Sequence, residues 1–316
     1  MRAAIGGYFE LELPHSRTFM YQGALKYQSA RAAFLALLRV SKPKRVWMPY
    51  YICDVMLAPV RASGAEVCFY SLDKHLGIAD DITLDSADIL LYVNYFGVCS
   101  GQVEKVLDRF NPSQVVLDFS QAFFIEPQKC LATIYSPRKF FGIPDGGLIF
   151  TELPLCTPEL LDTGSAGRMQ HLIKRLAGSP ELGYEDYQRS ETSLDDLEPR
   201  QMSNLTNRLL SSIDFGDAHA RRNENFLSLH KVLGTTNRLT LNAEPNGPLC
   251  YPYYSSDAGL RKKLISQRVF VPTYWADALS RINGDCLELD LVNSILPIPC
   301  DQRYSSKDMT QVLSSI

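Results

Sequence analysis

The chain has 316 residues and a formal net charge of −3 at pH 7. Hydrophobic residues make up 46% of it and charged residues 21%, a balance typical of a globular protein that excludes collagen-like, coiled-coil and disordered chains. The slight negative charge gives no electrostatic reason to expect a nucleic acid or an anionic membrane as a partner. The length favours two domains, because one domain has roughly 150 residues.

The N-terminal sequence and the spacing of the cysteines indicate the cellular compartment. Residues 1–17 contain acidic residues and a proline and lack a long apolar core, so we expect no signal peptide. No apolar run reaches the roughly 18 residues that a membrane-spanning helix requires. The eight cysteines form no CxxC pair and lie near no histidine cluster, which is typical of free thiols in a reducing compartment. These features predict a cytoplasmic protein without a metal site.

The first half of the chain alternates short apolar runs with helical stretches. Residues 30–40 (ARAAFLALLRV) predict a helix that begins after Ser29 as its N-cap. Further helices are expected at residues 52–62 and 102–110, and strands at residues 45–49, 66–70, 89–95, 114–118, 133–136 and 147–151. Because these strands are apolar throughout and are separated by helices, they predict a mostly parallel sheet covered on both faces.

The second half of the chain is less regular. Residues 152–202 are acidic and polar and predict surface helices and loops. Helical stretches are then expected at residues 205–233 and 257–267, and short strands at residues 249–254 and 269–271. The fold prediction is therefore a three-layer α/β large domain over residues 1–205, followed by a smaller α+β domain over residues 206–316.

A lysine before a glycine-rich turn is the sharpest local feature. Lys139 stands in the segment YSPRKFFGIPDGG (residues 135–147), between aromatic residues and two glycines that follow Asp145. Apolar surroundings lower the pKa of a lysine amine and so make it a better nucleophile. The glycines permit close approach of a ligand to the backbone. Taken alone, the pattern also fits a surface lysine before a hairpin turn.

Two other polar positions lie where parallel sheets bind ligands. Asp118 ends an apolar strand in LDFSQ (residues 117–121), where a carboxylate can hold a pyridine nitrogen protonated or can cap a following helix. The polar helix start QSARA (residues 28–32) offers backbone amides to a phosphate, although every helix has such an end.

The order of these segments resembles the DegT/StrS class of sugar aminotransferases, a branch of the aspartate-aminotransferase fold type. In that class a strand-end Glu-Asp-x-x-Gln segment precedes a lysine segment with a glycine-rich turn. Residues 117–121 match the first segment and residues 137–147 the second. The resemblance extends to residues 29–38, 48–51, 64–65, 202–203 and 296–304, and it is thin between residues 152 and 200.

The resemblance implies pyridoxal 5′-phosphate (PLP) as the cofactor. Lys139 would form the Schiff base with PLP and later move a proton between substrate and cofactor. Asp118 would pair with the pyridinium, and Gln121 would hydrogen-bond near the phenolic oxygen. Phosphate donors would come from the backbone or side chains of Ser29, Ala30 and Arg31.

Two polar positions depart from the class. The serine that the class places five residues before the lysine is Ile134 here, so Ser136 or Thr133 would take its role. The Asn-x-Arg segment that often reaches the site of a neighbouring subunit is replaced by residues 199–201 (PRQ). These departures affect the expected phosphate and substrate contacts more than the lysine.

The aromatic residue that commonly stacks on the cofactor ring is also absent. Its position corresponds to Cys53. We expect Tyr51 to take the role, with Tyr50 and Tyr95 as alternatives.

The class implies a homodimeric aminotransferase that moves an amino group from a glutamate-type donor to a keto-sugar nucleotide, in polysaccharide or secondary-metabolite biosynthesis. One alternative is a PLP-dependent sugar dehydratase, against which Lys139 argues because the related dehydratases lack the lysine. Another is a non-catalytic PLP-fold protein with a regulatory or assembly role, which the departures leave open. An unrelated dinucleotide-binding protein would need a GxGxxG loop after the first strand, and the sequence has none.

Overall fold

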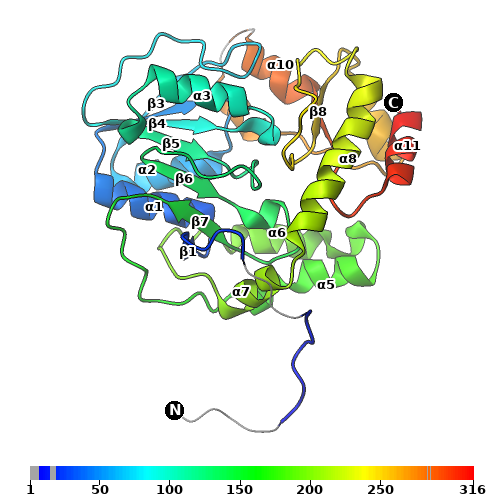
Figure 1. Cartoon of the computed structure of the whole chain (residues 1–316), viewed down its shortest axis with the longest axis horizontal. Helices are drawn as coiled ribbons and strands as arrows, with labels where there is room; N and C mark the ends of the chain where they lie inside the picture. Colours follow the sequence, from blue (N-terminus) through cyan, green and yellow to red (C-terminus); the bar gives the residue numbers. More distant parts are fainter. Residues whose placement is uncertain (1–6, 15–18, 283, 285) are drawn as a thin grey trace.

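A seven-stranded sheet forms the centre of the protein in the computed structural model, which describes residues 7–14, 19–282, 284 and 286–316 (Figure 1). Its strand order is β1-β7-β6-β5-β4-β2-β3. The strands are β1 (Leu25–Tyr27), β2 (Arg45–Pro49), β3 (Glu66–Tyr70), β4 (Asp88–Val93), β5 (Val115–Asp118), β6 (Ala132–Tyr135) and β7 (Gly147–Phe150). Every pair is parallel except those of β7, which is antiparallel to β1 and β6. The predicted mostly parallel sheet is confirmed.

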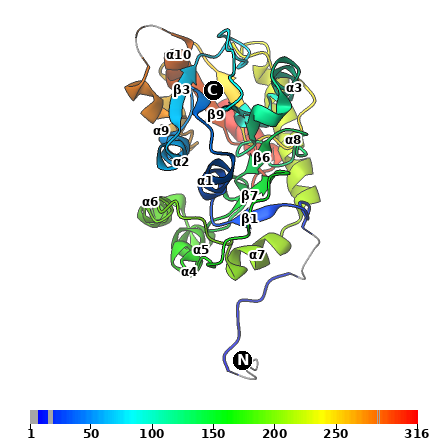
Figure 2. The ribbon, with the colours of Figure 1, turned by 90° about the vertical axis from the view of Figure 1, so that its left-hand side faces the viewer.

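Helices lie on both sides of this sheet. Figure 2 shows α1 and α2 on one side and α3 on the other. Their bounds, with those of the short 3-10 turns between them, are α1 (Ala30–Ser41), η1 (Asp54–Met56), α2 (Leu57–Ser63), η2 (Tyr95–Gly97), α3 (Ser100–Arg109) and η3 (Pro112–Gln114). The side chain of Ser29 accepts a hydrogen bond from the amide of Ala32 (3.2 Å), which confirms the predicted N-cap of α1. Every residue of β4, β5 and β6 is buried, as expected of central strands covered on both faces.

A group of short helices follows the sheet. Its members are α4 (Ser165–Arg168), α5 (Gln170–Ala177), η5 (Pro180–Gly183) and α6 (Tyr184–Thr192). Both views place α5 below β1, whereas α6 lies level with β7 and β1 and to one side of them. The predicted surface helices and loops of residues 152–202 are confirmed.

The remaining chain forms a smaller α+β part, as predicted. It contains α7 (Asn204–Ser211), α8 (Phe215–Leu233), β8 (Tyr251–Tyr254), α9 (Leu260–Ser266), η6 (Ala276–Ser280), α10 (Leu287–Ser294), β9 (Ile295–Ile298) and α11 (Ser306–Ser314). β8 pairs with β9 in an antiparallel two-stranded sheet. A hydrophobic cluster joins this sheet to α8, α9 and α11, with Phe226, Leu264 and Met309 as buried members.

The helical stretch expected at residues 205–233 is confirmed, whereas the strand expected at residues 269–271 was wrong. Residues 205–233 form two helices, because the side chain of Asp214 accepts a hydrogen bond from the amide of Asp217 (3.0 Å) and starts α8 anew. Residues 269–271 form no strand. The amide of Val269 donates instead to the carbonyl of Leu264 (2.9 Å) and closes the end of α9.

Neither a membrane-spanning helix nor a cluster of metal-binding side chains occurs among the described residues. Within them, no helix is both long enough and apolar enough to cross a membrane. The same residues contain no group of three or more His, Cys, Asp or Glu side chains that could hold a metal ion.

Candidate functional site

Neighbouring strands β5 and β6 bring Asp118 and the lysine segment to one edge of the sheet. Asp118 is the last residue of β5 and pairs with Ile134 of β6. β6 ends at Tyr135, and the 3-10 turn η4 (Pro137–Lys139) follows it almost at once. The carboxyl ends of parallel strands are where ligands bind in such sheets. Asp118 and Lys139 therefore share the edge at which a cofactor is expected.

Asp118 is buried and its carboxylate is partly engaged. One oxygen accepts a hydrogen bond from the amide of Ser120 (2.8 Å), which closes a tight local turn. No helix starts here, so the alternative that Asp118 is a helix N-cap is wrong. Among the described residues, no hydrogen bond reaches the second oxygen. That oxygen is the group able to pair with a pyridinium.

Lys139 stands exposed at the end of η4. Its amide donates to the carbonyl of Ser136 (3.0 Å), which fixes the turn. Within the part of the chain that the structure describes, its ammonium makes no hydrogen bond and no ion pair. Phe140 and Phe141 pack into a buried aromatic cluster around Phe123, with ring centroids 5.7 and 5.0 Å from it. These rings hold the turn in place and do not form the apolar walls around the amine that the sequence suggested.

The charges of Asp118 and Lys139 both act on the thiol of Cys53. Cys53 follows β2 and is half-buried. Burial raises the pKa of its thiol, the nearby Lys139 cation opposes that rise, and the Asp118 carboxylate and the Arg31 guanidinium act in opposite directions on it. Charges act this way only over short distances. The end of β2, the end of β5, η4 and the first turn of α1 therefore converge on one place.

The glycine turn after Lys139 packs against the start of α1. The amide of Gly146 donates to the carbonyl of Gln28 (2.7 Å), and Gly146 forms a bridge with Ser29. A side chain at Gly147 would overlap the backbone of Ser29 and Ala30, so only glycine fits there. The space beside these glycines, where a ligand was expected to approach the backbone, is therefore filled by the backbone at the start of α1. This contact fixes the first turn of α1 relative to η4.

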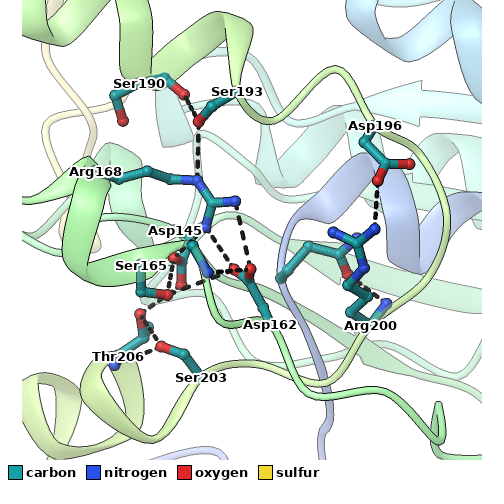
Figure 3. Close-up of polar contacts among 12 residues, drawn as sticks. Asp145, Asp162, Ser165, Arg168, Ser190, Ser193, Asp196, Arg200, Ser203 and Thr206 are labelled. Carbon is teal, nitrogen blue, oxygen red and sulfur yellow. Dashed lines mark hydrogen bonds and ion pairs between the residues drawn. The ribbon is translucent and has the colours of Figure 1, made fainter.

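A buried acid–base cluster holds the same turn from the other side (Figure 3). Asp145 accepts hydrogen bonds from Arg168 (2.9 Å), Ser165 and Thr206, and Arg168 also pairs with Asp162. Burial raises the pKa of Asp145. Burial opposes the ionisation of Asp162 too, but the Arg168 guanidinium outweighs it and lowers the pKa of that carboxyl. The cluster joins the glycine turn to α4 and α7.

The remaining cofactor candidates face protein groups. The side-chain oxygen of Gln121 accepts from the amide of Phe96 (2.7 Å). Tyr51 is fully buried, and its hydroxyl donates to the carbonyl of Tyr274 (2.8 Å). Ser136 is buried at the start of η4. Among the described residues, no hydrogen bond reaches the amide nitrogen of Gln121.

The second half of the chain also holds the lysine turn, which the sequence did not suggest. Arg222 of α8 and Gln302 both donate to the carbonyl of Phe140, the residue after Lys139, at 3.1 and 2.8 Å. Such a contact between distant segments leaves no local pattern in a sequence. Arg303, which follows Gln302, pairs with Asp301 (2.7 Å) and so has a structural partner.

Solved structures of known enzymes share this architecture. The sugar aminotransferase CalS13 from Micromonospora echinospora superposes with a TM-score of 0.62 at 15% identity, over 92% of this chain and 86% of that chain. A DegT DnrJ EryC1 StrS aminotransferase from Brucella abortus gives 0.60 at 14%, over 92% and 84%. Helicobacter pylori PseC, an aminotransferase involved in the biosynthesis of pseudoaminic acid, gives 0.59 at 15%, over 92% and 85%.

The chain has the sugar-aminotransferase fold. This confirms the predicted fold class of an α/β large part with a mostly parallel sheet and a smaller α+β part. No protein-family model matches the sequence, and no curated protein matches it.

Proposed function

We propose that the protein is a PLP-dependent aminotransferase of the DegT/StrS class, which moves an amino group from a glutamate-type donor to a keto-sugar nucleotide. The observation that carries the proposal is the shared edge of β5 and β6, where Asp118 ends one strand and Lys139 follows the other. Structures with this fold include sugar aminotransferases, which supports the choice of reaction.

The groups at this edge fit PLP. Asp118 has one carboxylate oxygen without a hydrogen bond from the described residues, as a partner for a protonated ring nitrogen requires. Within the described residues, the exposed Lys139 amine makes no ion pair that would compete with an aldehyde. Ser29, Ala30 and Arg31 lie in and before the first turn of α1, where amides and a guanidinium suit a phosphate.

When bound, PLP supplies an electron sink for the negative charge that develops on the reacting carbon. Lys139 would take the proton from that carbon and return it on the other side of the transfer. Asp118 would keep the proton on the ring nitrogen. Gln121 would donate from its amide nitrogen, because its oxygen is already held by Phe96.

Three further residues would support the cofactor because of where they lie in the fold. Ser136 would take the role of the missing phosphate serine, since it lies buried at the start of η4. Tyr51 would support the cofactor wall from within its aromatic cluster, where its ring meets Trp275 edge-on at 4.9 Å. Cys53 would contact the cofactor ring at the position where the class has an aromatic residue.

The oligomeric state, the compartment, the pathway and the domain boundary are proposed as well. We propose a homodimer in the cytoplasm that acts in the biosynthesis of a polysaccharide or secondary metabolite. The boundary predicted between residues 205 and 206 falls inside α7, so we propose that the smaller domain begins with that helix.

Absorption spectroscopy tests the proposal. Wild-type protein with added PLP should show a protein-bound cofactor band that changes when glutamate is added, and Lys139→Ala should lack that band. Lys129→Ala is the matched control, because Lys129 is exposed but precedes β6 at its opposite end. A wild-type spectrum that shows free cofactor and no protein-bound band would contradict the proposal.

A further inference from the structure

Two ion pairs join the surroundings of Lys139 to the end of α6. Arg138, which precedes Lys139, donates from both terminal nitrogens to the two carboxylate oxygens of Glu191, with Nη2 and Oε2 2.7 Å apart. Arg31 in the first turn of α1 pairs through Nη1 with Asp195, just after α6, at 2.8 Å. Both arginines that flank the proposed cofactor site are therefore bound by carboxylates of one segment.

Positive charge is concentrated around Glu191. Burial opposes its ionisation, but Arg138 outweighs burial, and Arg31 and Lys139 add to the effect, so the pKa of Glu191 is lowered. The pKa of Arg31 is lowered by burial and then by repulsion from Arg138. Three cations thus act on the Glu191 carboxylate, and two of them, Arg31 and Arg138, are paired with Asp195 and Glu191.

The ion pair between Arg138 and Glu191 can also break at little cost. Its side chains are 16% and 33% exposed, and Arg138 provides the only hydrogen bonds to the Glu191 carboxylate among the described residues. The Arg168–Asp145 pair is 8% and 0% exposed, and two hydroxyls bind the same aspartate. A carboxylate with one partner and access to water can leave without exposing other unpaired groups.

We propose that Arg138 recognises a carboxylate of the substrate, and that this carboxylate replaces Glu191 on the guanidinium when it binds. The planar guanidinium already holds a side-chain carboxylate through two parallel hydrogen bonds, the geometry that a ligand carboxylate would reproduce. The exchange keeps the number of charge-assisted hydrogen bonds, so the affinity comes from the other contacts of the ligand. The inference rests on the proposed function for its ligand, because a glutamate-type donor carries carboxylates beside its amine.

Calorimetric titration with glutarate tests this exchange, since this dicarboxylate has neither an amine nor a keto group. Glu191→Gln removes the competing charge at constant shape and should bind glutarate at least tenfold more tightly than wild type. Arg138→Gln should show no binding, and Arg138→Lys should bind weakly, because it keeps the charge without the planar fork. Glu198→Gln is the matched control: it breaks the two-hydrogen-bond pair of Glu198 with Arg39 elsewhere on α1 and should behave as wild type.

Three results would overturn the inference: equal affinity in Glu191→Gln and wild type, unchanged binding in a folded Arg138→Gln, or tighter binding of inorganic phosphate than of glutarate. If Arg138→Gln fails to fold, the comparison of Glu191→Gln with Arg138→Lys decides. Covalent attachment of PLP at Lys139 is a separate readout. If PLP attaches at Lys139 but Glu191→Gln does not change the affinity for glutarate, only this inference is contradicted. If Glu191→Gln raises the affinity for glutarate but PLP does not attach at Lys139, only the proposed function is contradicted.

Discussion

The lysine turn lies between two charged clusters that differ in burial. On one side, Arg168, Asp145 and Asp162 form a cluster with side-chain exposures of 8%, 0% and 1%. On the other, Arg138 and Glu191 keep 16% and 33% of their side-chain surface exposed. The first cluster ties the turn to two helices and fills its hydrogen bonds, whereas the second has a single interaction open to water. The comparison separates charges that hold the site from charges that can exchange with a ligand.

The largest expected effect lies in the buried cluster. Arg168→Met should leave Asp145 and Asp162 without their cation and destabilise the protein by about 3–5 kcal/mol, the usual loss when one partner of a buried pair is removed. Urea denaturation followed by circular dichroism measures it. A loss below about 1 kcal/mol, the value of an exposed pair, would remove the distinction between the two clusters.

The exposed pair should give a smaller and pH-dependent effect. Glu191→Gln should cost about 1 kcal/mol or less at neutral pH, because the pair is partly solvated. The pKa of Glu191 in the folded protein lies below its unfolded value of about 4.3, so its contribution is complete above that pH and is lost as the pH falls through the folded pKa.

Unfolding free energies of wild type and Glu191→Gln at pH 7 and pH 3 measure this dependence. The difference between the two proteins should shrink at pH 3. A difference that grows as the pH falls would contradict the assigned sign.

The smallest effect concerns the thiol between the charges of the site. Lys139 lowers the pKa of Cys53 and Asp118 raises it, against a background of burial that raises it. At pH 8, Lys139→Ala should therefore slow alkylation of Cys53 a few-fold, and Asp118→Asn should speed it, since the thiolate is the reactive form. Peptide mass spectrometry with iodoacetamide gives the rates, and the exposed Cys156 serves as the internal control. Equal rates in both variants would place Cys53 away from these charges.

The sheet could be predicted from the sequence because its central strands are buried on both faces. The strands at residues 45–49 and 66–70, nearer the sheet edge and only partly buried, also have the predicted bounds, because each contains a short apolar run after its first charged residue. β9 was missed because it follows α10 without an intervening turn and contains Pro297. β1 has three residues, too few for a periodic pattern.

The candidate site, like the sheet, contains residues that the sequence predicts and residues that it does not. Asp118 and Lys139 were predicted because each lies in a local segment that resembles a known class. Arg138 and Glu191 were not, because 53 residues separate them and neither segment shows that they meet. The departures at Ile134 and Cys53 were visible in the sequence, but their surroundings required the three-dimensional fold.

The most direct test of the account is the position at which PLP attaches. Wild-type protein is incubated with PLP, reduced with borohydride and digested, and the labelled lysines are identified by peptide mass spectrometry. If Lys139 is the Schiff-base lysine, the wild type carries a stoichiometric label on Lys139, and Lys139→Ala shows only trace labelling of surface lysines such as Lys129. A label spread over surface lysines without enrichment at Lys139 would contradict this role of Lys139.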